Sequence, residues 1–150
     1  MLDDAGTWTG VKFKARLNVR GDQQRDDQIN PDHRSSPTAD IDSIRLFIAT
    51  LAGDPNNELL KFDVVGAFLQ AKLDPRQPPI FMHAPQGMHL APGQMLKLNT
   101  NIYGLVEAAY LWFMEFSAKA KQLGWIQGSF DPFIFTMPGP DGSSGMIIHG

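Results

Sequence analysis

Residues 11–20 alternate strictly between apolar and polar side chains, and this pattern restricts the fold more than any other feature of the chain. The apolar set is Val11, Phe13, Ala15, Leu17 and Val19, and the polar set is Lys12, Lys14, Arg16, Asn18 and Arg20. A period of two predicts a half-buried β-strand with one face in a core. The other face is cationic, and the stretch contains no acid. We therefore expect a strand that can bind phosphate groups in one place.

Charge and composition limit the class of protein that contains this strand. The chain carries 13 Lys and Arg against 16 Asp and Glu, which argues against a simple nucleic-acid-binding module with a basic surplus. With 43% apolar and 19% charged residues, its composition is globular. The absence of Cys excludes disulfides and thiolate zinc sites, and no apolar run is long enough to span a membrane. We expect a single core in an intracellular protein without membrane contacts.

The remaining pattern mixes helices and strands without a regular βαβ repeat, which predicts the α+β class. A long polar loop is expected to follow Arg20 and to reach Ser36. Helices are predicted at residues 36–53, 66–73 and 105–122, the first with one apolar face and the last with Gly124 as its C-cap. Strands are predicted at residues 59–65, 80–82, 95–98, 133–137 and 146–149, the last two joined by a turn-rich connector.

Asp63 is the most informative single residue, because it lies within the apolar run of residues 59–65. An unpaired carboxylate is costly to bury in such a run. The side chain could cap the short helix that begins near Gly66, or it could hold magnesium at the end of a strand. The residues alone leave both interpretations open.

Five segments, taken in order, resemble the reverse transcriptase of copia-type LTR retrotransposons over about residues 6–148. Residues 12–21 resemble the basic strand of the family's fingers. Residues 62–69, with an Asp followed by an Ala–aromatic pair, resemble its first catalytic motif. The later matches are Ile80-Phe81-Met82 with Pro85-Gln86-Gly87, Lys97-Leu98-Asn99 with Ile102-Tyr103-Gly104-Leu105, and Asp131-Pro132. The shared order makes the resemblance specific.

The resemblance implies an incomplete polymerase right-hand fold, with a mostly antiparallel sheet and packed helices. It implies one partial domain over residues 1–150, fingers-like over about residues 1–60 and a partial palm with an interleaved fingers segment over about residues 61–150. The implied activity is RNA-directed DNA polymerisation, a nucleotidyl transfer that uses Mg²⁺. The implied partners are a nucleic acid template-primer, deoxynucleotides and the remainder of the retrotransposon polyprotein, in a cytoplasmic virus-like particle.

The resemblance also assigns roles to individual residues. Asp63, as the first catalytic aspartate, and the carbonyl of Val64 would hold metal, and the N–H groups of Gly66 and Ala67 would bind the triphosphate. Phe68 would be a steric gate that favours deoxynucleotides. Either Lys14 or Arg16 would grip the triphosphate, and the sequence does not decide between them. The base pair and the template would be shaped by Tyr103, Gly104 and Leu105.

Two departures from the family pattern bear on activity. The chain reaches Gly150 without the family's x-Asp-Asp hairpin, so we expect that this polypeptide alone does not polymerise. A Lys, a Gln and an Arg of the family pattern are replaced by Val106, Glu107 and Tyr110. We expect an acid there to repel a phosphate backbone, so that either the template is held differently or the element has decayed.

Two other functions compete with a polymerase fragment. One is a non-catalytic nucleic-acid-binding remnant of a decayed element, and the other is an unrelated α+β binding domain. The four histidines, His33, His83, His89 and His149, lack metal-ligand spacing, so we expect them to be surface or loop residues.

Overall fold

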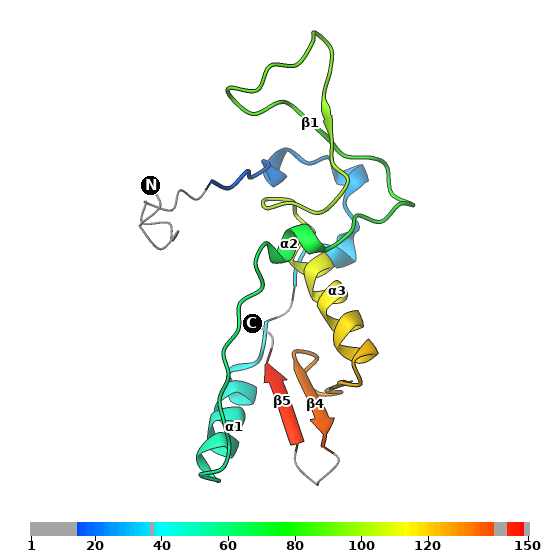
Figure 1. The fold of residues 1–150 in the computed structure, drawn as a ribbon. Coiled ribbons are helices and arrows are strands. Elements are labelled where there is room, and N and C mark those ends of the chain that lie inside the picture. Colours follow the sequence, from blue (N-terminus) through cyan, green and yellow to red (C-terminus); the bar gives the residue numbers. More distant parts are fainter. Residues whose placement is uncertain (1–14, 37, 140–143, 149–150) are drawn as a thin grey trace, which may run out of the picture.

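The structure, a computed structural model, describes residues 15–36, 38–139 and 144–148. It has the predicted α+β composition, with antiparallel sheets. Its helices are α1 (Ile41–Ala52), α2 (Ala67–Gln70) and α3 (Ala108–Gln122). Its strands are β1 (Phe81–Met82), β2 (Leu96–Lys97), β3 (Ile126–Gln127), β4 (Ile134–Pro138) and β5 (Ser144–Ile148). Figure 1 shows an elongated molecule with α3 near its middle, the β4–β5 pair at one end and the β1 ribbon at the other.

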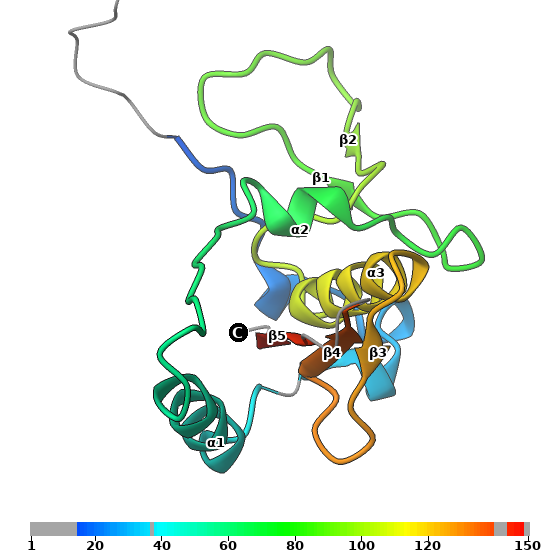
Figure 2. The same ribbon diagram turned by 60° about the horizontal axis from the view of Figure 1, so that its bottom comes forward.

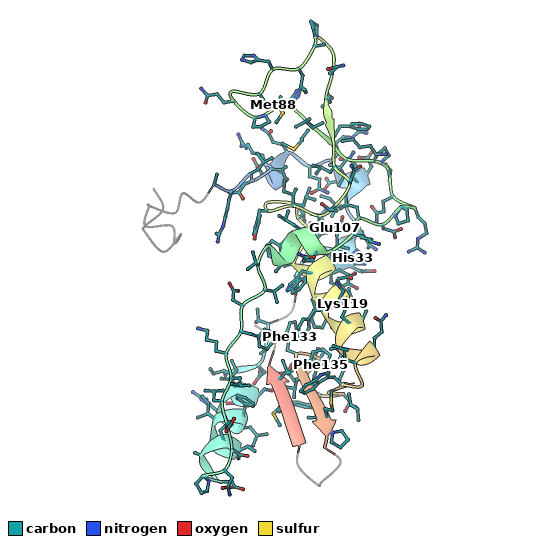
Figure 3. All side chains as sticks on the ribbon, in the orientation of Figure 1. His33, Met88, Glu107, Lys119, Phe133 and Phe135 are labelled. Carbon is teal, nitrogen blue, oxygen red and sulfur yellow. The ribbon has the colours of Figure 1, made fainter. Side chains whose placement is uncertain are left out.

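An aromatic core joins α3 to the three-stranded sheet, in which β3, β4 and β5 pair in that order. The rings of Phe113 and Phe133 stack with centres 4.3 Å apart, and Phe116 meets Phe135 edge-on at 5.6 Å. Phe133 and Phe135 are fully buried and lie beside α3 (Figure 3). Helix α3 ends as predicted, because Gly124 takes a positive φ of 90° that turns the chain into β3.

A second core lies where α2 crosses the N-terminal end of α3 (Figure 2). Its buried members are Ile102, Leu105 and Ala108, and the half-buried residues packed against them are Val19, Phe68, Leu73, Ile80 and Leu98. Asn101 is completely buried beside this core. Its amide donates to the Ala108 carbonyl at 2.9 Å and its own N–H donates to Ala71 at 3.0 Å, so it joins α2 to α3.

Two predicted strands are wrong. Residues 15–20 are irregular, and the rest of the predicted strand, residues 11–14, lies outside the described residues. Residues 59–64 are extended, but their backbone forms no hydrogen bond with another described residue. Both segments have a sequence pattern suited to a strand. Neither has a neighbouring strand in the described ranges with which its backbone could pair.

The first predicted helix begins later than expected. Asp40, rather than residues 36–38, caps it through the Asp42 N–H at 2.7 Å, and Pro37 lies outside the described residues. The predicted apolar face is not buried, since Ile41 and Ile48 are each 58% exposed. Residues 21–33, expected to be an open loop, contain three 3-10 turns and bury Ile29. No helix within the described ranges is long and apolar enough to cross a bilayer.

The hairpins are closer to prediction. The antiparallel ribbon of β1 and β2 and the β4–β5 pair lie where strands were predicted, with Phe135 opposite Ile147. His149 lies outside the described residues. Strand β3, which pairs with β4, was not predicted.

Asp131 fastens the start of α1 to the start of β4. Its carboxylate is buried, with Oδ1 accepting the Phe133 N–H at 2.9 Å and Oδ2 accepting the Asp40 N–H at 3.1 Å. Burial alone would raise the pKa of Asp131. Hydrogen bonds from the Ser43 side chain and from those two N–H groups outweigh this effect, so the pKa lies below its ordinary value.

Acid is expected to remove the stability that Asp131 contributes. Because its pKa is lower in the folded state, the contribution is complete above the unfolded pKa of about 3.9 and is lost as pH falls through the folded pKa. Asp131→Ala leaves the buried Phe133 N–H and the part-buried Asp40 N–H without an acceptor, so we expect a loss of about 1–3 kcal/mol at neutral pH. Urea unfolding of both proteins over a pH series measures this. The same acid dependence in wild type and variant would contradict the assignment.

Candidate active site

Three of the predicted site residues form one continuous surface. The guanidinium carbon of Arg16 lies 5.5 Å from the centre of the Tyr103 ring, within the range of a cation–π contact. The Tyr103 ring is 5.2 Å from the Phe68 ring at an interplanar angle of 55°. Arg16 comes from the N-terminal segment, Tyr103 from the loop before α3, and Phe68 from α2. The fold therefore gathers a cation and two aromatic rings that are far apart in the sequence.

Arg16 keeps its charge available, whereas its neighbour Arg20 does not. Arg20 pairs with Asp22 at 2.6 Å, and its hydrogen bond lowers the pKa of that carboxyl. Arg16 is exposed and forms no ion pair with an acid in the described ranges. Lys14, the other predicted phosphate ligand, lies outside the described residues. Among the described cations of this segment, Arg16 is thus the one that can meet an incoming anion.

The chain turns sharply just before Phe68. Gly66 takes the left-handed conformation, with φ 64° and ψ 36°, which glycine adopts without steric cost. The N–H groups of Gly66, Ala67 and Phe68 donate to no other described residue, as is usual in the first turn of a helix. This turn presents backbone donors next to the Phe68 ring.

Asp63 does not cap α2. The N-cap position is Gly66, no side chain caps the helix, and Asp63 is exposed. Its carboxylate takes part in no ion pair or hydrogen bond with the described part of the chain. Asp63 also does not end a strand, because residues 59–64 pair with none of the described strands. Of the two interpretations left open by the sequence, local capping is therefore wrong, and the described residues do not form the strand end that the magnesium interpretation assumed.

Asp63, Val64 and Ala67 border a cavity of about 430 Å³ between the extended segment of residues 59–64 and β5. Its other walls include Trp112, Phe116, Met146 and Ile147. An adjoining cavity of about 400 Å³ shares Phe62, Val64 and Ile147 and is mostly apolar. An open space therefore separates the carboxylate's segment from the edge of the sheet.

The N-terminal segment touches the loop before α3 backbone to backbone. Val19 N–H donates to the Tyr103 carbonyl at 2.9 Å. A Cβ on Gly104 would lie 2.0 Å from the Val19 carbonyl oxygen, and one on Gly21 would lie 2.1 Å from the Gly104 oxygen. Gly104 also has a φ of 93°. Gly104 thus lies close to the chain's own backbone, while Leu105 is buried in the core behind it.

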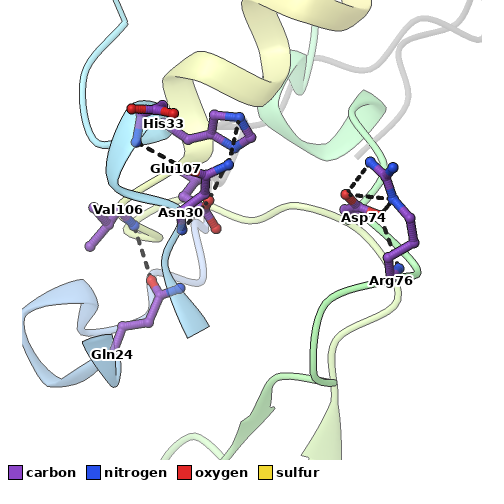
Figure 4. A network of polar contacts seen from close by, with 8 residues as sticks. Gln24, Asn30, His33, Asp74, Arg76, Val106 and Glu107 are labelled. Atoms are coloured by element: carbon purple, nitrogen blue, oxygen red, sulfur yellow. Dashed lines mark hydrogen bonds and ion pairs between the residues drawn. The ribbon is translucent and has the colours of Figure 1, made fainter. Parts of the chain in front are cut away.

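Glu107 is turned into the protein, contrary to the expectation of an acid facing phosphates. Its side chain is 8% exposed, and its Oε1 lies 3.3 Å from His33 Nδ1 (Figure 4). His33, predicted to be a surface residue, is half-buried and stacks on Tyr110 with ring centres 4.1 Å apart. Two of the three positions that depart from the family pattern therefore contact the same histidine. The sequence gives no signal for this pairing, because the partners are distant along the chain.

The structure thus brings together some of the predicted residues and separates others. Arg16, Tyr103 and Phe68 touch in series, and Gly66 and Ala67 adjoin Phe68. Asp63 and Val64 lie on the cavity instead and have no contact with Arg16. Within the described ranges, no three His, Cys, Asp or Glu side chains gather closely enough to hold a metal ion.

Comparison with known proteins identifies relatives over nearly the whole chain. The profile of a family described as Reverse transcriptase (RNA-dependent DNA polymerase) matches residues 3–148. The retrovirus-related Pol polyprotein from transposon TNT 1-94 of Nicotiana tabacum is 34% identical over 127 residues, which are 83% of this chain and 9% of that protein. Those from transposons RE1 and RE2 of Arabidopsis thaliana are 28% identical over 130 residues, 84% of this chain and 8% of each. The chain therefore spans less than a tenth of the length of these relatives. No solved structure matches significantly.

Proposed function

This chain belongs to the reverse transcriptase (RNA-dependent DNA polymerase) family, as its resemblance to copia-type retrotransposons predicted, and we propose that, as part of a Pol polyprotein, it binds the incoming deoxynucleotide. The observation that carries the proposal is the continuous surface of Arg16, Tyr103 and Phe68. It combines a free cation with aromatic faces, the two features that a nucleoside triphosphate needs from a binding site.

In this proposal Arg16 binds the triphosphate through its guanidinium fork, with Lys14 as a second cation. The N–H groups of Gly66 and Ala67, which donate to no other described residue, donate to phosphate oxygens. Tyr103 supports the new base pair, Leu105 lies in the core behind this loop, and Gly104 holds the N-terminal segment against it. The role of each residue is therefore to orient the nucleotide before reaction.

Replacing both Lys14 and Arg16 with Ala is expected to weaken the binding of a deoxynucleoside triphosphate. It should also flatten the dependence of binding on salt, because two charge contacts are lost. Titration of the 150-residue chain at several salt concentrations measures both effects, and Arg45→Ala is the control, since Arg45 is an exposed arginine on α1 paired with Asp42. Unchanged affinity in the double variant would remove the basic segment from the nucleotide site.

Phe68 is proposed as the steric gate for the sugar. Its ring is half-buried against Tyr103, so it is fixed rather than free to move aside. In a longer polypeptide with polymerase activity, Phe68→Ala is expected to raise ribonucleotide incorporation, because the space for a 2′-hydroxyl opens. Primer extension with matched ribo- and deoxynucleotides checks this. Continued rejection of ribonucleotides would assign Phe68 to the core alone.

Asp63 and the Val64 carbonyl are proposed as magnesium ligands. Both offer oxygen donors, which Mg²⁺ prefers, and the Asp63 carboxylate is exposed and uncommitted. When bound, Mg²⁺ supplies the charge that activates the primer 3′-hydroxyl and stabilises the leaving pyrophosphate. The family's remaining acids lie on an x-Asp-Asp hairpin. The cavity of about 430 Å³ beside Asp63 leaves room for a few side chains of such a segment next to the carboxylate.

We propose further that the chain acts as part of a right-hand polymerase on a template-primer. In this proposal residues 1–60 are fingers-like and residues 61–150 are a partial palm with an interleaved fingers segment, within a polyprotein assembled into cytoplasmic particles. Without the acidic hairpin, the isolated chain is expected not to extend a primer, since Asp63 cannot hold two metal ions alone. Primer extension by the purified 150-residue chain would contradict this.

A further inference from the structure

The segment that carries Arg16 is joined to the start of α3 by a row of hydrogen bonds. These are Val19 N–H to the Tyr103 oxygen (2.9 Å), Val106 N–H to Gln24 Oε1 (3.2 Å) and Asn30 N–H to Glu107 Oε1 (3.1 Å). The two segments run in the same direction along this row of bonds. The row begins at Val19, three residues after Arg16, and ends at the contact between Asn30 and Glu107.

Glu107 is committed to this contact rather than to its own helix. It occupies the N-cap position of α3, yet its side chain forms no cap. Instead Oε1 serves two donors on the facing segment, the Asn30 N–H and the His33 ring nitrogen Nδ1 (Figure 4). A buried acceptor that serves two donors leaves both of them unsatisfied when it is removed.

The geometry around His33 fixes which ring nitrogen carries the proton. Asn30 Oδ1 accepts the Asp32 N–H at 3.1 Å, so its other amide atom, the donor Nδ2, must face His33 Nε2 at 3.2 Å. Nε2 can then only accept. Nδ1 therefore carries the proton and donates to Glu107 Oε1, which describes a neutral imidazole. A reversed Asn30 amide would place two donors against each other at Asp32.

Other groups hold the ring in this orientation. Tyr110, one turn along α3 from Glu107, stacks on it at an interplanar angle of 16°. A cavity of about 330 Å³ beside the ring is also lined by Asp74 and Lys97. Hydrogen bonds from Arg76 lower the pKa of Asp74 to about 2, so that carboxylate is already paired. His33 is thus held by contacts to Asn30, Glu107 and Tyr110.

We infer that Glu107, acting through Asn30 and neutral His33, is a positioning residue that holds Arg16 over Tyr103 for the nucleotide. This inference rests on the proposed function of Arg16. A carbonyl oxygen suffices for the role, because both donors are neutral. Glu107→Gln therefore keeps the contact, whereas Glu107→Ala removes it.

The protonation state of His33 can be measured without any substitution. In ¹⁵N-labelled chain, the two imidazole nitrogen shifts of His33 are expected to show a neutral ring protonated at Nδ1. A ring protonated at Nε2, or at both nitrogens, at neutral pH would overturn the arrangement. This result does not depend on nucleotide binding, so it is independent of the proposed function.

The positioning role is tested by titrating a deoxynucleoside triphosphate with Mg²⁺ into the 150-residue chain. Glu107→Ala is expected to weaken binding by about tenfold, because loss of the buried acceptor leaves the Arg16 segment in place in only about a tenth of the molecules, while Glu107→Gln stays close to wild type. Glu115→Gln, an acid on the same helix paired with Lys119, is the control. In the Arg16→Ala background, Glu107→Ala should have no further effect, because Glu107 acts through Arg16.

Two results would overturn the inference while leaving the proposed function intact: equal weakening by Glu107→Gln and Glu107→Ala, or additive effects of Glu107→Ala and Arg16→Ala. If Arg16→Ala alone leaves binding unchanged, the proposed function of Arg16 fails instead. Where Glu107→Ala does not fold, as judged by circular dichroism, the comparison of Glu107→Gln with wild type and the His33 spectrum decide the question.

Discussion

Gly104→Ala is expected to detach residues 15–34 from the rest of the protein and to lower the free energy of unfolding by roughly 3–5 kcal/mol. Two costs combine at this position. The φ of 93° is unfavourable for any residue with a Cβ, and that Cβ would lie 2.0 Å from the Val19 carbonyl oxygen. The backbone hydrogen bond from Val19 to Tyr103 cannot survive the displacement.

Two further glycines separate these costs. Gly93 has a similar φ of 83°, but a Cβ added there would meet nothing within 4 Å, so Gly93→Ala reports the backbone cost alone. Gly21 lacks a positive φ, but its Cβ would lie 2.1 Å from the Gly104 oxygen, so Gly21→Ala reports the steric cost. Urea unfolding gives the free energies, and limited trypsin digestion at Arg16, Arg20 and Arg25 reports detachment. If Gly104→Ala behaves like Gly93→Ala, the close contact is not what holds the segment.

Asp63→Asn is expected to reduce polymerisation by about a thousandfold in a longer polypeptide that includes the acidic hairpin. Such a loss corresponds to about 4 kcal/mol of transition-state stabilisation, in keeping with removal of a charged metal ligand. The structure suggests that this loss will not come from misfolding, since Asp63 is exposed and bonds to no residue in the described part of the chain. Single-nucleotide primer extension measures the rate.

Glu58→Gln is the matched control for Asp63→Asn. Glu58 is an exposed acid just before the same extended segment and lies on the wall of a neighbouring cavity, so its replacement changes net charge equally. It is expected to leave the rate near wild type. A rate within tenfold of wild type for Asp63→Asn would remove this residue from the metal site.

Local patterns predicted the elements whose partners are close in sequence. The β4–β5 hairpin was predicted because two apolar runs flank a turn-rich connector, and α3 because apolar residues recur on one helical face from Leu105 to Ala120. Residues 59–64 show the limit of this reasoning. Their apolar run is suited to a strand, but pairing depends on a neighbour that the run itself does not specify.

The candidate site was also predicted only in part. Phe68 and Tyr103 were predicted through the family resemblance, and the structure places their rings in contact. The inward turn of Glu107 could not be predicted, because it depends on Asn30 and His33, which lie more than 70 residues away. Asn101 was missed for a similar reason, since its burial follows from packing between α2 and α3.

In the proposed function, the surface of Arg16, Tyr103 and Phe68 binds a nucleotide whose metal ion lies at Asp63. Paramagnetic broadening by Mn²⁺ tests it most directly, with a deoxynucleoside triphosphate added to ¹⁵N-labelled 150-residue chain. Amide signals of residues 63–68 and 103–105 are expected to broaden first, and Asp63→Asn is expected to abolish the effect. Broadening centred elsewhere, or unchanged by Asp63→Asn, would contradict the claim.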